Sequence, residues 1–172
     1  LRLLLAASLV AAVMQPLINA ETRLFGSGPL YVIVDDDWAS AQRWPARLEA
    51  MRGLIDHAGR SGRSVALVRT APTPKGVTAQ SMQLMAAADA RSMLERMQPR
   101  PWRADRRATI QRLLEWAANG NHRPGDVVWL SSGLEAVDAP KTDTMDALTR
   151  RLRRLGSVRV MSEPAGRLSV IL

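Results

Sequence analysis

Short apolar runs alternate along this chain with longer stretches that mix apolar and polar residues. Three of the runs, at residues 30–34, 64–68 and 127–130, are rich in Val and Leu and show no polar alternation. That pattern is typical of strands that are buried on both faces of a parallel sheet. Two further runs, at residues 158–161 and 168–171, predict a last pair of strands, which we interpret as an edge pair.

The stretches between the runs place their apolar residues at helical spacing. In the first of them, Leu48, Met51 and Ile55 share one face. Strict alternation of strand and helix predicts a parallel sheet that is covered on both faces. The chain therefore predicts an α/β fold, a three-layer α/β/α domain with a mainly parallel sheet. Its expected helices cover residues 39–60, 78–97, 104–118 and 141–155.

An uncharged apolar stretch lies at the N-terminus, at residues 3–20, between Arg2 and Glu21. It is just long enough to span a bilayer. It can be a secretory signal with an imperfect cleavage site at residues 18–20, or an uncleaved anchor whose flanking Arg keeps its N-terminal side in the cytoplasm. Both interpretations place the rest of the chain outside the cytoplasm.

The first residue is Leu rather than Met, and Gln15-Pro16 lies near the end of the apolar stretch. Both features favour an internal transmembrane helix, so we expect the chain to be a piece of a longer protein. The expected organisation is a transmembrane helix or signal anchor at residues 1–20, a linker at 21–29 and an α/β domain at 30–172.

The composition narrows the possible chemistry. The chain has no Cys, which excludes disulfides and thiolate metal sites. Its 24 Lys and Arg residues exceed its 16 Asp and Glu residues, for a net charge of +8. Such an excess of positive charge can favour binding to nucleic acid or to an anionic membrane surface. No helix-turn-helix, zinc-finger or basic–aromatic pattern accompanies it, so we interpret it as solvated helix faces and expect no nucleic-acid partner.

Polar residues gather where the first and third strands end. In an open α/β sheet, ligands bind outside the carboxyl ends of the strands, and a topological switch point brings such ends together. This sheet end is therefore the candidate site. Its candidate residues are Asp35, Asp36, Asp37, Trp38, Ser40, Ser131, Ser132 and Gly133.

These features resemble a von Willebrand factor A-type domain. In that family the first strand ends in the Asp-x-Ser-x-Ser loop of a metal-ion-dependent adhesion site, and here it ends in Asp35-Asp36-Asp37. A middle strand ends in Ser131-Ser132-Gly133, where the family usually has Thr/Ser-Asp-Gly. The loop at residues 100–105 lies where the family often supplies a Thr. The resemblance implies a Rossmann-like α/β fold that presents its ligand site at the sheet end.

The chain is also similar to bacterial BatA-like (aerotolerance-regulator) membrane proteins with a DUF4159 domain. The motifs that carry this resemblance are at residues 14–17 (MQPL), 34–38 (VDDDW) and 128–134 (VWLSSGL). It implies an anchor in the bacterial inner membrane through residues 3–20 and a domain that faces the periplasm. It also implies a further helix upstream and a further domain downstream.

The metal site that the family carries is incomplete in this sequence. If Asp35 takes the family's Asp position, Ala39 stands at the second Ser; if Asp36 takes it, Trp38 stands at the first. Ser132 stands where the later turn usually has Asp, and the connecting loop offers no Thr. A hard divalent cation needs about six oxygen ligands. We therefore predict a degenerate site without a bound metal or other cofactor, with Mg²⁺ as the alternative.

The three acids then need a structural role. We expect Asp37 to cap the following helix, and Asp35 and Asp36 to accept backbone N–H bonds in the turn. Trp38 and Trp44 are expected to pack as lids over the sheet end.

An enzymatic alternative uses the same acids. A strand followed by Asp-x-Asp also opens the haloacid-dehalogenase phosphatases, where Asp35 would be the nucleophile, Asp37 the general acid and Ser131 a phosphate ligand. That Mg²⁺-dependent chemistry needs a Lys and a further acidic pair, and neither Lys75 nor Lys141 follows a convincing strand. The chain also lacks Gly-x-Ser-x-Gly, Walker and dinucleotide-binding motifs.

We therefore expect a membrane-anchored, non-catalytic interaction or scaffold module. Its protein partner would dock at the sheet end built by residues 35–40 and 131–135. The Mg²⁺-dependent phosphohydrolase is the alternative.

Overall fold

Our computed structural model describes residues 26–73, 81–134 and 143–162. The described strands and helices follow the predicted order, with two successive helices between the second and third strands and two short 3₁₀ helices (η) beside the α-helices. In chain order the elements are β1 (Leu30–Val34), η1 (Trp38–Arg43), α2 (Trp44–Arg60), β2 (Val65–Arg69), α3 (Ala87–Glu95), α4 (Arg106–Asn119), β3 (Gly125–Ser131), α5 (Met145–Leu152), η3 (Arg153–Leu155) and β4 (Gly156–Ser162).

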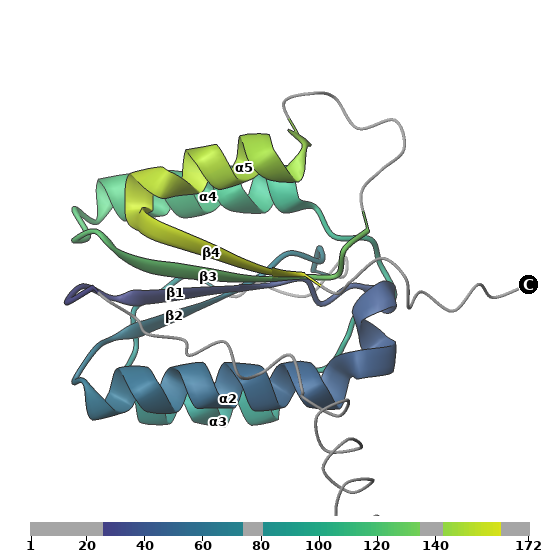
Figure 1. The fold of residues 1–172 in the computed structure, drawn as a ribbon, viewed down its shortest axis with the longest axis horizontal. Coiled ribbons are helices and arrows are strands. Elements are labelled where there is room, and N and C mark those ends of the chain that lie inside the picture. The colour runs from purple at the N-terminus through teal and green to yellow at the C-terminus, as the bar shows by residue number, and fades with distance from the viewer. Residues whose placement is uncertain (1–25, 74–80, 135–142, 163–172) are drawn as a thin grey trace, which may run out of the picture.

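The described strands form one parallel sheet in the order β2-β1-β3-β4. Helices α2 and α3 cover one face of the sheet, and α4 and α5 cover the other (Figure 1). The predicted three-layer α/β/α architecture is therefore confirmed. The central strand β1 ends beside both neighbours, because Val34 is in register with Arg69 of β2 and with Leu130 of β3.

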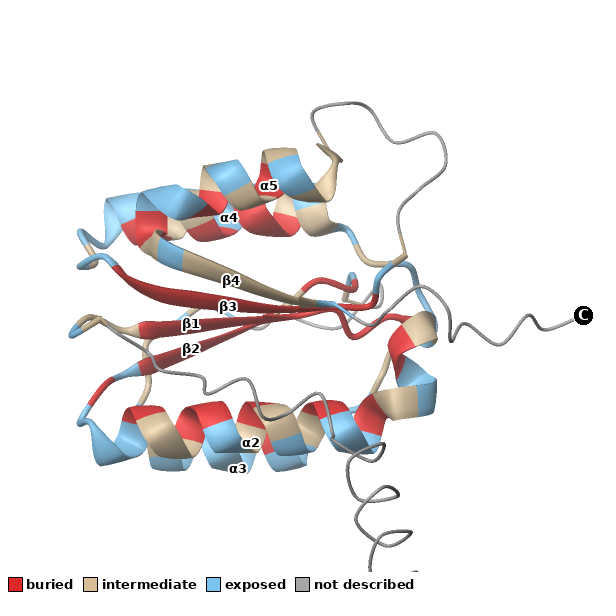
Figure 2. Ribbon diagram, in the orientation of Figure 1, coloured by how far each residue is buried: buried red, intermediate tan, exposed pale blue. Residues whose placement is uncertain are grey.

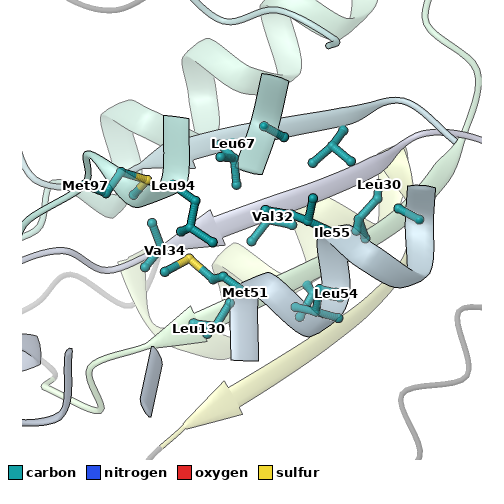
Figure 3. Packing of buried hydrophobic residues seen from close by; sticks show 14 of the residues in the cluster. Leu30, Val32, Val34, Met51, Leu54, Ile55, Leu67, Leu94, Met97 and Leu130 are labelled. Carbon is teal, nitrogen blue, oxygen red and sulfur yellow. The ribbon is translucent and has the colours of Figure 1, made fainter. Parts of the chain in front are cut away.

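Alternate residues of β1 pack into two separate cores. Val32 and Val34 contact Met51 and other residues of α2 and α3 (Figure 3), and Tyr31 and Ile33 contact the α4–α5 layer. All five residues of β1 are fully buried, and β1, β2 and β3 form the buried centre of the molecule (Figure 2). This burial on both faces explains why the strand is a continuous apolar run.

One predicted helix starts nine residues later than expected. The spacing predicts a helix at residues 78–97, but α3 begins at Ala87, and Met82 and Ala86 lie outside it. Met85 instead forms an antiparallel bridge to the edge strand β2, with two backbone N–H···O bonds of 2.9 Å to Val65. A tertiary contact therefore overrides the helical spacing at this point.

The other element boundaries differ less. The expected helix at residues 39–60 is divided into η1 and α2, and Pro45 lies at the start of α2, where its missing N–H is harmless. The helix at 141–155 is observed as α5 followed by η3. Strand β4 lies at the edge, parallel to β3. The expected strand at 168–171 and the apolar stretch at 1–20 lie outside the described residues.

Within the described ranges, no helix is long and apolar enough to cross a membrane.

Candidate functional site

The sheet topology brings the Asp cluster and the Ser pair together. Backbone bonds join the end of β1 to both neighbours, because Asp35 N–H donates to the Leu130 carbonyl at 2.9 Å and Thr70 N–H donates to the Val34 carbonyl at 3.1 Å. Ser132 then bonds to two of the acids, with its N–H donating to Asp35 Oδ2 at 2.9 Å and its hydroxyl to Asp37 Oδ2 at 3.0 Å. The topology therefore brings Asp35, Asp37 and Ser132 into direct contact.

The carboxylate of Asp35 is fully buried and accepts five hydrogen bonds. Oδ1 accepts from the Thr70 hydroxyl at 2.8 Å and from the Trp129 indole N–H at 3.1 Å. Oδ2 accepts from Arg106 Nε at 2.9 Å, from Arg106 Nη2 at 2.7 Å and from Ser132 N–H at 2.9 Å. A carboxylate offers about four lone-pair positions, so these donors saturate it.

Arg106 supplies the positive charge that faces Asp35. It is the first residue of α4, directly after Asp105, whose carboxylate caps the helix by accepting from Ala108 N–H at 3.1 Å. Its guanidinium also donates to the Ser132 hydroxyl at 3.1 Å and lies 5.8 Å from the ring centre of Trp129. A rigid helix start thus holds a cation against the end of β1.

Asp36 turns toward the opposite side, to the end of β2. Its Oδ2 accepts from Arg69 Nε at 2.6 Å and lies 3.6 Å from Arg100 Nε, and its Oδ1 accepts from Ala71 N–H at 2.8 Å. Burial and the nearby charge of Arg69 lower the pKa of Arg100, and Asp36 opposes that change. Two guanidinium groups therefore share one carboxylate.

Asp37 is a buried acid with hydrogen-bond donors around its carboxylate. Its Oδ1 accepts from Ser40 N–H at 3.1 Å, and the Ser40 hydroxyl donates to its carbonyl at 2.6 Å. Burial raises its pKa above the ordinary value, and the charge of Asp35 adds to the rise. The hydrogen bonds from Ser132 and Ser40 and the charge of Arg106 act in the opposite direction.

The expected structural roles of the acids are confirmed for Asp37 and only in part for Asp35 and Asp36. Asp37 caps η1 through Ser40, and Asp35 and Asp36 each accept a backbone N–H bond. Those two N–H groups belong to Ser132 and Ala71, in the loops after β3 and β2, rather than to the turn after β1.

The expectation for the two tryptophans is half right. Trp44 is buried, and its indole N–H donates to the Met97 carbonyl at 3.2 Å. Trp38 does not act as a lid, because 55% of its surface is exposed. Asp37 starts the 3₁₀ helix at Trp38, and this side chain is left in solvent.

Several residues that build the site are absent from the sequence-based set of candidates. Thr70 follows the second strand directly. Because the carboxyl ends of parallel strands lie at the same edge of a sheet, this position could have indicated that Thr70 belongs to the site. The sequence indicates only weakly that Arg106 belongs to the site. It is one of many arginines, and only its position after a helix cap distinguishes it. The missed residues are Arg69, Thr70, Arg100, Arg106 and Trp129.

The donor set at the sheet end does not fit a divalent cation. A hard cation needs about six oxygens, many of them from carboxylates. Here both oxygens of Asp35 are taken, and the guanidinium of Arg106 faces Oδ2, where a metal would need access. Over the described ranges, no three His, Asp or Glu side chains converge as metal ligands.

The arrangement does not favour the phosphohydrolase alternative either. Asp35 is saturated by donors and is 0% exposed, so neither oxygen is directed at a substrate. Asp37 is 1% exposed and bonded to Ser40 and Ser132. Lys75 and Lys141 lie outside the described residues.

The parallel sheet between helical layers, with an acid after the inner strand β1, has a von Willebrand A-like α/β fold. Among solved structures, the chain is similar to proximal thread matrix protein 1 of the mussel byssus, with 15% identity and a TM-score of 0.53 over 79% of this chain and 36% of that one. A second structure of that protein, described as having a zinc-occupied MIDAS motif, gives 16% identity and a TM-score of 0.50 over 78% and 37%. The chain thus spans about a third of the mussel protein.

A third similar structure is the SpRpn10 VWA domain, at 10% identity and a TM-score of 0.48, over 80% of this chain and 77% of that one. No family model matches the sequence, and no curated protein matches it. At these identities the similarity shows the fold, so the expected von Willebrand A-like fold is confirmed. The BatA-like relationship stays a prediction.

Proposed function

We propose that this chain is a protein-interaction or scaffold module that docks its partner at the carboxyl end of the sheet and does so without a metal ion. The observation that carries the proposal is the ion pair between Asp35 and Arg106, at 2.7 Å. It supplies a fixed positive charge where a metal-dependent module would hold its ion. In this proposal the metal-ion-dependent adhesion site is degenerate, and no catalytic chemistry takes its place.

The exposed aromatic residues support docking at this end. Trp38 and Trp102, exposed by 55% and 43%, are the large hydrophobic side chains that the described part of the chain leaves in solvent. Trp38 follows the acids of β1. The loop that carries Trp102 is joined to the same end, because Arg100 N–H donates to the Asp36 carbonyl at 2.6 Å. Exposed tryptophans are frequent hot spots of protein interfaces.

The polar cluster beneath this surface would act as a rigid support. Each of the three acids accepts a hydrogen bond from a loop that follows a neighbouring strand, so these bonds fix the positions of the strand ends relative to one another. A surface that is already ordered loses little conformational entropy on binding. In this proposal the acids organise the docking surface, and the tryptophans contact the partner.

The apolar sequence at residues 3–20 supports a membrane tether for the module. We propose an anchor in the bacterial inner membrane, with the domain facing the periplasm, in an architecture of the BatA-like, DUF4159-containing type. Confinement to the membrane would raise the effective concentration of neighbouring partners. Fractionation of the membranes, followed by protease treatment of spheroplasts, tests this topology. Protein that is soluble, or protected from protease in spheroplasts, contradicts it.

Site-specific photo-crosslinking tests the docking surface. A photoreactive residue is placed at Trp38, and a matched one at the exposed Arg60, which ends α2 near the amino ends of the strands. In cells that express the full chain, we expect a discrete cross-linked species from position 38 and none from position 60. The same species is expected after incubation with EDTA. Cross-linking from position 60 alone would contradict the docking surface, and loss of the species in EDTA would contradict metal independence.

A further inference from the structure

A cavity of about 340 Å³ lies beside the edge strand β2, and Arg69 and Arg100 in its lining pair with Asp36. One side of the cavity is formed by the carboxyl half of β2 and the loop that follows it, and another by α4. This volume is within the range of roughly 300–1,000 Å³ that is typical of ligand pockets. The described residues that line it are Leu67, Val68, Arg69, Ala71, Thr73, Ser81, Met82, Arg100, Arg112 and Trp116.

The charge of the cavity is unbalanced. Three arginines, Arg69, Arg100 and Arg112, line it, and none of its described lining residues is an Asp or Glu. Among the described residues, the carboxylate that pairs with these arginines is that of Asp36, at 2.6 Å from Arg69 and 3.6 Å from Arg100. Three guanidinium charges against one carboxylate leave a net charge of about +2 around the cavity.

The other hydrogen bonds of these arginines orient the guanidinium groups but do not neutralise them. Arg69 donates to the Gln98 carbonyl at 2.6 Å, and Arg100 donates to the Ala71 carbonyl at 2.8 Å. Arg112 donates to the Thr109 hydroxyl at 3.3 Å. Carbonyl and hydroxyl oxygens carry no net charge. The lowered pKa of Arg100, caused by burial and by the charge of Arg69, agrees with this imbalance.

We propose that this cavity, which we call the arginine pocket, is a binding site for an oxyanion, either a phosphate group or a carboxylate. Guanidinium groups present parallel N–H donors that match both kinds of group. Thr73 and Ser81 are also among the lining residues, and their hydroxyls can add donors. Trp116 adds an aromatic wall for an organic part attached to the anion.

The arginine pocket differs from the proposed docking surface in what it recognises. The proposed docking surface presents exposed tryptophans, whereas the pocket selects negative charge, so the inference goes beyond the proposed function. Binding to the pocket is measured without any protein partner. A failure of this proposal is therefore distinguishable from a failure of the cross-linking at position 38.

Calorimetric titration of the full chain tests the proposal, with inorganic phosphate and a tetraglutamate peptide as separate probes. The test variant is Arg112→Gln, because Arg112 is exposed and its bond to Thr109 lies within α4, so the fold should be retained. The matched control is Arg154→Gln, which removes the same charge from the exposed η3. Far-UV circular dichroism checks that both variants are folded.

We expect saturable binding of at least one probe, weakened about tenfold or more by Arg112→Gln and unchanged by Arg154→Gln. Binding of phosphate alone assigns a phosphate group to the pocket, and binding of the peptide alone assigns a carboxylate. Absence of saturable binding of both probes would overturn the proposal. An equal loss in the two variants would also overturn it, because it would indicate only nonspecific attraction to a basic protein.

Discussion

At the scale of single residues, the most informative contact is the one between Asp35 and Arg106. The two residues are 71 positions apart in the sequence, and the parallel topology brings them within hydrogen-bond distance. A buried carboxylate needs a cation or several donors, and here it has both. The carboxylate of Asp35 is therefore satisfied by groups of the protein itself.

Removing that cation should destabilise the domain strongly. Arg106→Gln leaves the buried carboxylate of Asp35 without its counter-charge, and we expect a loss of about 3–5 kcal/mol in the free energy of unfolding. Arg107→Gln is the matched control on the same helix. Its side chain is 56% exposed and its contact with Asp143 is 3.5 Å, so we expect a change within about 0.5 kcal/mol.

Denaturant unfolding monitored by tryptophan fluorescence measures both variants. Asp35→Asn and the double variant complete a cycle that isolates the pairwise coupling between Asp35 and Arg106. Equal stabilities of the two arginine variants would show that Arg106 is dispensable, and would remove the main argument for metal independence.

Asp37 should make the stability depend on pH in the direction opposite to a paired acid. Its pKa in the folded state is raised above the ordinary 3.8, so the folded protein binds this proton more tightly than the unfolded chain does. Stability from this group is then lost as the pH rises from about 4 through the raised pKa. Asp37→Asn removes this effect and keeps a side chain that can cap η1.

Urea unfolding of Asp37→Asn and the parent chain at pH 4, 5.5 and 7 tests this direction. We expect the variant to gain stability relative to the parent as the pH rises. A constant difference, or a relative loss at pH 7, contradicts the raised pKa.

At the scale of the elements, α2 offers a pair of glycines with opposite environments. A Cβ atom added to Gly53 meets nothing within 4 Å, whereas one added to Gly59 comes within 2.9 Å of the Ala87 Cβ in α3. Gly59 therefore permits the close approach of the two helices, and Gly53 only lowers the helix propensity of α2.

Substituting each glycine by alanine should separate these two roles. We expect Gly53→Ala to raise the free energy of unfolding by about 0.5–1 kcal/mol, because alanine is the better helix former. We expect Gly59→Ala to give no gain or a loss, because the new methyl group forces α2 and α3 apart. Thermal unfolding followed by circular dichroism measures both, and a similar gain in the two variants would contradict the close helix contact.

At the scale of the whole molecule, the sequence predicts the layers better than the site. The buried strands are readable because Leu30–Val34 must be apolar on both faces, and the periodicity of α2 and α4 marks their buried sides. The late start of α3 is not readable, because it depends on the bridge between Met85 and Val65.

Only part of the candidate site can be predicted from the sequence, for a similar reason. Strand ends place Asp35 and Ser132 at one edge, and that much follows from topology. The choice of Arg106 as the cation, and of Arg69 and Arg100 for Asp36, depends on side chains that reach across loops. No local pattern in the sequence encodes such contacts.

The position of β1 between β2 and β3 also has a consequence for the order of assembly during synthesis. Leu30 pairs with Val65 on one side and with Asp126 on the other. One edge of β1 therefore has no hydrogen-bonded neighbour until β3 is synthesised, much later in the chain. Closing so long a loop is slow, and an unpaired apolar strand is prone to aggregate. A nascent chain that stops before residue 125 should therefore hold an open strand edge and need protection by a chaperone until β3 emerges.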